Sequence, residues 1–241
     1  MIQFLTVNLL FACWSHLLNY IGTVLLYSQN PTRCFSCNQT VSWSLFVPFY
    51  GYACSCSQIL LYYPTLLTLL GITMFNALYF SHSTFFIAAF LFCSCLLINI
   101  RTDAETSLLS RFTTVYPVPL FVAASYYNQL PIDFVDSLTG ICLGYGFLWI
   151  IRWIFFCVTK KEGLGVGDLE LLALIGAFLG PVGAWISILV GSILGTLYIS
   201  IQRVITQRQI QQIPFGPFLS IGGFIYIIFQ QSIINLLLYP Y

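Results

Sequence analysis

The sequence predicts an all-α polytopic membrane protein with about eight transmembrane helices. Of its 241 residues, 59% are hydrophobic and only 6% are charged, whereas a soluble domain carries roughly 25% charged residues. A soluble fold of this composition would expose a continuous apolar surface, so lipid is the solvent that fits it. The net charge is only +1, and no basic stripe alternates with aromatic residues, so the sequence excludes nucleic acid as a partner.

Eight apolar segments approach the length of about 20 residues that crosses roughly 30 Å of hydrocarbon. The expected spans are 4–26, 61–80, 84–100, 113–128, 138–157, 166–182, 183–202 and 216–238. The stretch 166–202 is one long apolar run, interrupted at Gly180-Pro181 and Gly183, and is compatible with one bent helix or two short ones.

The basic residues favour two helices in that stretch. With eight spans, every lysine and arginine falls in or beside a loop on one side of the membrane. These residues are Arg33, Arg101, Arg111, Arg152, Lys160, Lys161, Arg203 and Arg208. Basic loops remain in the cytoplasm, so the prediction is a multi-pass protein of the bacterial cytoplasmic (inner) membrane with both termini outside.

Three regions follow from this organisation. Residues 1–27 lack a basic leader and a clear small-residue cleavage site, so we expect a first transmembrane helix there rather than a signal peptide. Residues 28–60 are too polar to span and form a cytoplasmic loop, and 61–241 carry the remaining spans. The loop holds two close cysteine pairs, Cys34 with Cys37 and Cys54 with Cys56. This pattern suits tetrahedral zinc, with free or redox-active thiols as the alternative.

Two aspartates stand apart from the other acidic residues. Asp103 and Asp168 lie at the predicted cytoplasmic ends of apolar spans, so they share a depth in the membrane. Two carboxyl groups held close together cannot both ionise cheaply, so one keeps a proton while the other stays charged. Such a pair can activate water as general base and protonate a leaving amine as general acid.

Glycines precede the second aspartate at alternate positions. Gly163, Gly165 and Gly167 allow unusual backbone dihedrals and the close approach of a substrate strand. The alternative is a simple loop in which Asp168 caps a helix.

Several motifs together resemble the type IV prepilin peptidases. GLGVGDLELLALIGAFLG at 163–180 resembles their second aspartate motif, and DAETSLLSRFTT at 103–114 resembles the first. PFGPFLSIGG at 214–223 is similar to their last-helix motif, YP at 63–64 matches the start of their second helix, and the cysteine pairs resemble their zinc-binding loop. The resemblance covers nearly the whole chain in the right order.

The resemblance implies a transmembrane aspartic protease domain over 61–241 with Asp103 and Asp168 as catalytic dyad. Its substrates would be prepilins or pilin-like proteins, cut just after a glycine at the end of a basic leader on the cytoplasmic face. N-methylation of the new N-terminus with S-adenosylmethionine would follow. Two departures bear on methylation, because the family usually has glutamate where this chain has Leu67 and lysine where it has Glu170.

Other functions remain as alternatives. Membrane-edge aspartates could relay ions in a transporter or channel, although transport acids tend to lie near mid-membrane. A third hypothesis is that the protein is an inactive scaffold of a pilus or secretion machine. Among proteases, a presenilin-like or archaeal preflagellin peptidase is the runner-up, and the long cysteine loop argues for the bacterial prepilin type.

Overall fold

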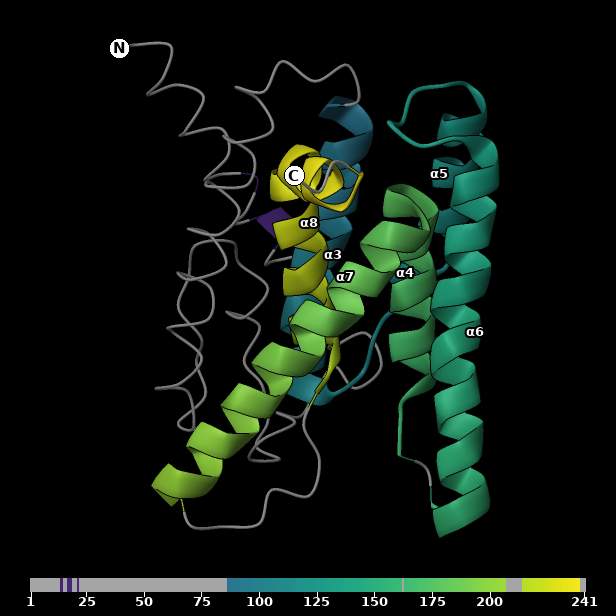
Figure 1. Ribbon diagram of the computed structural model, residues 1–241. Helices are drawn as coiled ribbons and strands as arrows, with labels where there is room; N and C mark the ends of the chain where they lie inside the picture. The colour runs from purple at the N-terminus through teal and green to yellow at the C-terminus, as the bar shows by residue number, and fades with distance from the viewer. Residues whose placement is uncertain are drawn as a thin grey trace. The chain divides into compact units, whose positions relative to one another are not determined.

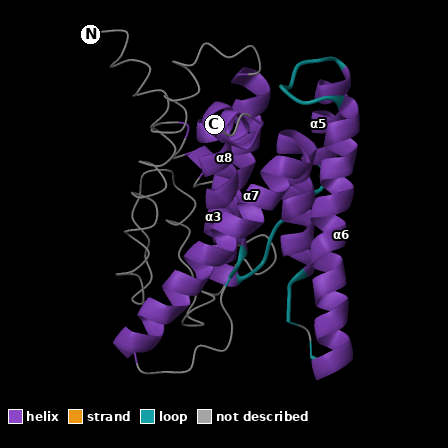
Figure 2. Ribbon diagram, viewed as in Figure 1, coloured by secondary structure: helices purple, strands orange, loops and turns teal. Residues whose placement is uncertain are grey.

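The computed structural model describes residues 14, 17, 18, 21, 86–161, 163–206 and 214–238. Every regular element among these residues is an α-helix, as Figures 1 and 2 show. The chain divides into two compact units, one ending at Ser110 and the other beginning at Arg111. The expected cysteine loop and the span at 61–80 lie outside the described residues, as does the span at 4–26 except for four helical positions.

The first unit contains α3, Phe86–Thr106. Its 21 residues correspond to about 30 Å at 1.5 Å per residue, enough to cross a membrane. Trp14 packs against this helix: its ring lies 5.1 Å from that of Phe90, and its indole N–H donates to Ser94 Oγ at 3.0 Å. The helix ends where the amide of Ser107, in left-handed conformation at φ 55°, donates to the Asp103 carbonyl at 2.8 Å.

Among its described residues, the second unit contains five helices. They are α4 (Arg111–Thr114), α5 (Pro117–Tyr126), α6 (Phe134–Thr159), α7 (Val166–Thr206) and α8 (Gly216–Leu238). The single span expected at 113–128 is divided into α4 and α5 by a turn before Pro117. Proline lacks an amide donor, so Pro117 cannot continue the hydrogen-bond ladder of α4, and it suits the first position of a new helix.

Helices α6 and α7 pack closely through small residues. Ser137 Oγ on α6 donates to the Ala177 carbonyl on α7 at 2.7 Å. Gly140 faces the backbone of Gly176, and Gly144 faces the Leu172 carbonyl. As the contact positions on α6 come later in the sequence, their partners on α7 come earlier, so the two helices are antiparallel. Small residues let helix backbones approach closely in membrane proteins, where apolar burial gives little preference for helix–helix over helix–lipid contact.

Gly180 divides α7 into two helical segments. Its φ of 73° and ψ of −174° are non-helical and belong to a region that is open essentially to glycine alone. Pro181 follows and begins the second segment, a position that suits its fixed φ. In Figure 1 the second segment runs back obliquely toward the end of the unit where α7 began. The interruption expected at Gly180-Pro181 is therefore present.

Helix α8 packs on this returning segment of α7. Gly222 faces the backbone of Ser187, and Gly191 faces the backbone of Phe218 and Leu219. Within its own helix, Ser187 Oγ donates a hydrogen bond to the Gly183 carbonyl at 2.7 Å. The same small-residue packing that joins α6 to α7 thus also joins α7 to α8.

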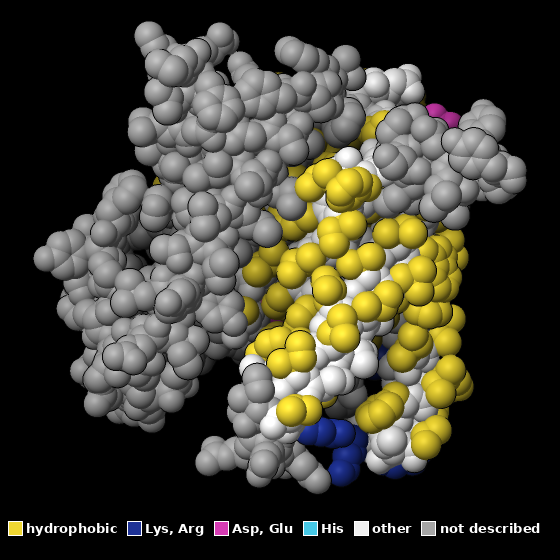
Figure 3. Space-filling view, turned by 60° about the vertical axis from the view of Figure 1, so that its left-hand side comes forward, with side chains coloured by type: hydrophobic (Ala, Val, Ile, Leu, Met, Phe, Trp, Pro, Cys, Tyr) yellow, Lys and Arg dark blue, Asp and Glu magenta, His cyan; other side chains and the backbone are white. Residues whose placement is uncertain are grey.

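Three described helices are long and apolar enough to cross a membrane, with windows at Ile87–Ala104, Phe134–Thr159 and Val166–Val204. Only 11% of the α6 window is buried, which leaves an apolar surface that needs lipid or protein cover. On the face in Figure 3, hydrophobic side chains cover most of the described surface, and lysine and arginine gather at its lower end. The described part of the chain is that of a helical membrane protein, and the number of eight spans stays a prediction.

Candidate active site

Asp168 lies in the first turn of α7. Its side chain is almost buried, with 9% exposed, and Leu169, Leu171 and Leu172 beside it in sequence are fully buried. A Cβ added at Gly165 would lie 3.4 Å from Asp168 Oδ2, so the carboxyl group folds back over the loop that leads into the helix. The positive end of the helix dipole favours a negative carboxylate there. The structure thus places Asp168 inside the helix, one turn beyond a capping position.

The loop glycines have different surroundings. A Cβ at Gly163 would lie 2.5 Å from the Phe155 ring, so the loop at this point lies against α6. Gly165 leaves room beside the Asp168 carboxyl group, and Gly167 is already helical. Close approach therefore accounts for Gly163 and Gly165 in the described structure, and their role toward a substrate stays a prediction.

Asp103 lies near the C-terminal end of α3 and is 4% exposed. The preceding residues Asn99, Arg101 and Thr102 are also buried, and Thr102 Oγ1 donates to the Asn99 carbonyl at 3.3 Å. Burying ionisable and amide groups in an apolar helix is costly, so such a group of residues makes this end of α3 a candidate functional region.

Contacts within the second unit show which helix ends lie together. Thr114 of α4 contacts Glu170, and Phe121 of α5 packs edge-on against Phe178 at 5.0 Å. The α4–α5 segment therefore runs parallel to the start of α7, while α6 runs antiparallel to it. Arg111, which follows the short connector 107–110 after α3, accordingly lies at the same end of the unit as Asp168.

Basic residues gather toward this end as well. Lys160 and Lys161 follow the end of α6, and Arg203 lies in the last turn of α7. The acidic residues Asp133 and Asp136 lie at the opposite end of α6, as its N-cap and in its first turn.

Arg152, expected in or beside a loop, is instead within α6. Helix α6 is longer than the predicted 138–157 at both ends, since residues 134–137 and 158–159 also belong to it.

Glu170, separated from Asp168 by Leu169, has two partners on α4. Thr114 Oγ1 donates to Glu170 Oε2 at 3.2 Å, and Arg111 Nε lies 3.5 Å from Glu170 Oε1. In the sequence, Glu170 stands out only as a departure from the family pattern. Nothing local to the sequence indicated its partners, since Thr114 is 56 positions away.

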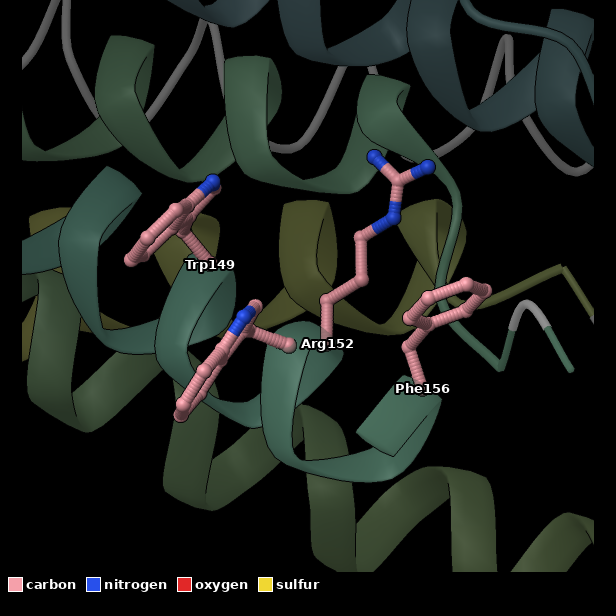
Figure 4. Close-up of a pocket in the computed structure, with 4 residues that line it drawn as sticks. Trp149, Arg152 and Phe156 are labelled. Atoms are coloured by element: carbon pink, nitrogen blue, oxygen red, sulfur yellow. The ribbon is translucent and has the colours of Figure 1, made fainter. Parts of the chain in front are cut away.

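A surface cavity of about 250 Å³ lies on α6 and is lined by Trp149, Arg152, Trp153 and Phe156 (Figure 4). These positions recur at the spacing of one helix face. In Figure 4 the Arg152 side chain and the Phe156 ring extend toward the same side, and Lys160 Nζ lies 5.9 Å from the Phe156 ring centre. Tryptophan and arginine together are typical of the level where hydrocarbon meets headgroups.

No group of three or more histidine, cysteine or acidic side chains that could hold a metal occurs among the described residues. The predicted ligands Cys34, Cys37, Cys54 and Cys56 lie outside them. Zinc therefore stays a prediction from the sequence.

Apolar helices that carry buried acids near their ends are typical of membrane proteins, in intramembrane enzymes as in ion relays. The type IV leader peptidase family matches residues 89–200. This region includes both aspartates, and through it the chain is similar to that family.

Curated relatives agree with this assignment. The chain is 39% identical over 102 residues to a prepilin leader peptidase/N-methyltransferase of Stutzerimonas stutzeri, covering 41% of this chain and 34% of the relative. It is 39% identical over 135 residues to that of Pseudomonas aeruginosa, covering 54% and 45%. The protein of the same name from Escherichia coli K12 is 36% identical over 136 residues, covering 56% and 59%. Each match spans less than two thirds of the relative's length, and no solved structure matches the chain.

Proposed function

We propose that this protein is an intramembrane aspartic endopeptidase that removes the basic leader from type IV prepilins or pilin-like proteins at the cytoplasmic membrane face. The observation that carries the proposal is the burial of Asp103 and Asp168, each near the end of an apolar helix and both within the region shared with leader peptidases. Relatives named as prepilin leader peptidases supply the substrate class.

The proposed chemistry uses the two carboxyl groups as one pair. The ionised carboxylate accepts a proton from water as the water oxygen adds to the carbonyl carbon of the scissile peptide bond. The protonated carboxyl group gives its proton to the leaving nitrogen as the C–N bond breaks. The pair titrates as a unit, so its protonation belongs to both aspartates.

The arrangement of charges supports a cytoplasmic location. Arg111, Lys160, Lys161 and Arg203 lie toward the end of the second unit at which Asp168 is buried, and basic residues favour the cytoplasmic side. Both acids belong to terminal parts of their helices rather than to the middle, which favours interfacial chemistry over the ion-relay alternative.

The direct test is to incubate the purified full chain, in detergent micelles, with an intact prepilin and measure product masses. We expect a leader fragment and a mature chain that begins just after the leader glycine. A prepilin with that glycine replaced by a bulky residue is the control and should remain uncut. If the intact prepilin also remains uncut in lipid vesicles, the proposed function is wrong.

Methylation is the second part of the proposal. In this proposal S-adenosylmethionine supplies a methyl group to the new N-terminal amine, and the relatives named as N-methyltransferases support a methyl transfer. In the same assay with S-adenosylmethionine added, we expect the mature product to gain the mass of one methyl group. A mature product without that gain removes this activity and leaves the peptidase proposal intact.

We further propose that Cys34, Cys37, Cys54 and Cys56 hold a structural zinc ion. Cysteine pairs at close spacing provide four thiolates for tetrahedral coordination. The purified chain should contain about one zinc per molecule by elemental analysis, and a Cys34→Ser/Cys37→Ser variant should lose it. The control is Cys142→Ser, because Cys142 is a free, exposed thiol on α6. Equal zinc content in the loop variant and the control would contradict the site.

A further inference from the structure

The first turn of α7 presents two acidic side chains to different surroundings. Asp168 and Glu170 are two positions apart, which separates them by about 200° around the helix axis. Asp168 folds back toward the glycine loop, whereas Glu170 contacts α4. Leu169 between them is fully buried. A small rotation of this turn would therefore have two effects at once. It would move the Asp168 carboxyl group, and it would strain the contacts of Glu170.

The loop that leads into α7 provides little restraint on that turn. Gly163 and Gly165 carry no side chains, so Gly165, at the position before the helix, cannot cap the first amides. Glycine also has more conformational freedom than any other residue. The orientation of the first turn must then be held from its other sides.

Two residues of α4 supply such a restraint, and we call Arg111, Thr114 and Glu170 the α4 clamp. Thr114 is fully buried and its hydroxyl donates to Glu170 Oε2. Arg111 Nε lies near the other oxygen, Oε1, but its side chain is 75% exposed, against 14% for Glu170. Exposed ion pairs contribute little, whereas the loss of a buried hydrogen bond leaves an unsatisfied polar group. The Thr114 contact is therefore the stronger part of the clamp.

We propose that Glu170 is a positioning residue, which through the α4 clamp holds the first turn of α7 so that the Asp168 carboxyl group keeps its reactive orientation. This inference rests on the proposed function for its kinetic consequence. Positioning errors of about 1 Å can cost on the order of 100-fold in rate without loss of substrate binding.

The test combines kinetics with hydrogen exchange on the full chain in micelles. Thr114→Val and Glu170→Ala are expected to lower kcat for leader removal about 10- to 100-fold, with KM changed less than about threefold. Amides 166–170 should exchange at least about tenfold faster in both variants, because the turn opens more readily. Thr114→Ser, which keeps the hydroxyl group, should restore both properties. Asp136→Asn, at an exposed acid in the first turn of α6, is the matched control.

Glu170→Gln separates the two arms of the clamp. Its amide oxygen can still accept from Thr114, but the charge attraction to Arg111 is lost. We expect kcat within about threefold of the original protein, since the exposed pair adds little. A loss as large as that of Glu170→Ala would overturn the assignment of the main restraint to Thr114.

Two further results would overturn the proposal as a whole. One is unchanged kcat in Thr114→Val, whatever the exchange rates. The other is a fall in kcat with unchanged exchange at 166–170. If the original protein cuts no prepilin, the proposed function is wrong. The exchange rates at 166–170 then still test whether the α4 clamp holds the first turn of α7.

Discussion

Replacing Asp168 by asparagine is expected to reduce leader removal by about 10³-fold or more. Asparagine has nearly the shape of aspartate, so the turn should keep its structure, but it can neither accept the proton of water nor donate one to the leaving amine. General acid–base groups contribute typically 10²- to 10⁴-fold each. The measurement is the initial rate of prepilin cleavage by purified enzyme, with folded fraction checked by size-exclusion chromatography.

Asp103→Asn should have an effect of the same size. In the proposed mechanism the two carboxyl groups act as one unit, so the double variant should be little slower than either single variant. Asp136→Asn is the control, since Asp136 is exposed at the opposite end of α6. Either single variant cutting at the normal rate would show that the aspartate pair is not the catalytic centre.

The second large effect concerns stability and is expected for Gly140→Ala or Gly176→Ala. Each glycine faces the backbone of the other across the α6–α7 contact, and a Cβ on Gly140 would lie only 2.8 Å from the Gly180 carbonyl carbon. Backbone cannot move aside as a flexible side chain can, so the helices must separate. Overpacking of this kind typically costs about 1–3 kcal/mol and can cost more.

Gly146→Ala on the same helix gives the matched control, because nothing lies within 4 Å of its added Cβ. Alanine in an open helical position should stabilise by roughly 0.5–1 kcal/mol relative to glycine. The two substitutions therefore have opposite expected signs, which thermal unfolding in micelles can measure. Equal stability of Gly140→Ala and Gly146→Ala would contradict the close α6–α7 packing.

The agreement between sequence and structure differs from element to element. The run expected at 84–100 corresponds to α3, and the run expected at 138–157 lies within α6. A long apolar segment without proline satisfies its backbone hydrogen bonds in lipid as an α-helix. The expected span at 113–128 is divided before Pro117, and α6 begins at Phe134, four residues before the span expected at 138–157. A hydropathy pattern shows which residues prefer lipid. It does not show how far a helix continues beyond the apolar run.

The sequence by itself determined that lipid is the solvent, that the fold is helical and that the chain is interrupted at Gly180-Pro181, and it predicted the two candidate aspartates. These properties are local: composition, run length and short motifs carry them. Only the tertiary structure decided that Gly140 lies against Gly176, that Glu170 is held by Thr114, and that Arg152 lines a cavity with Trp149 and Phe156. Contacts between distant residues depend on how helices pack and in which direction they run, and a hydropathy pattern contains neither.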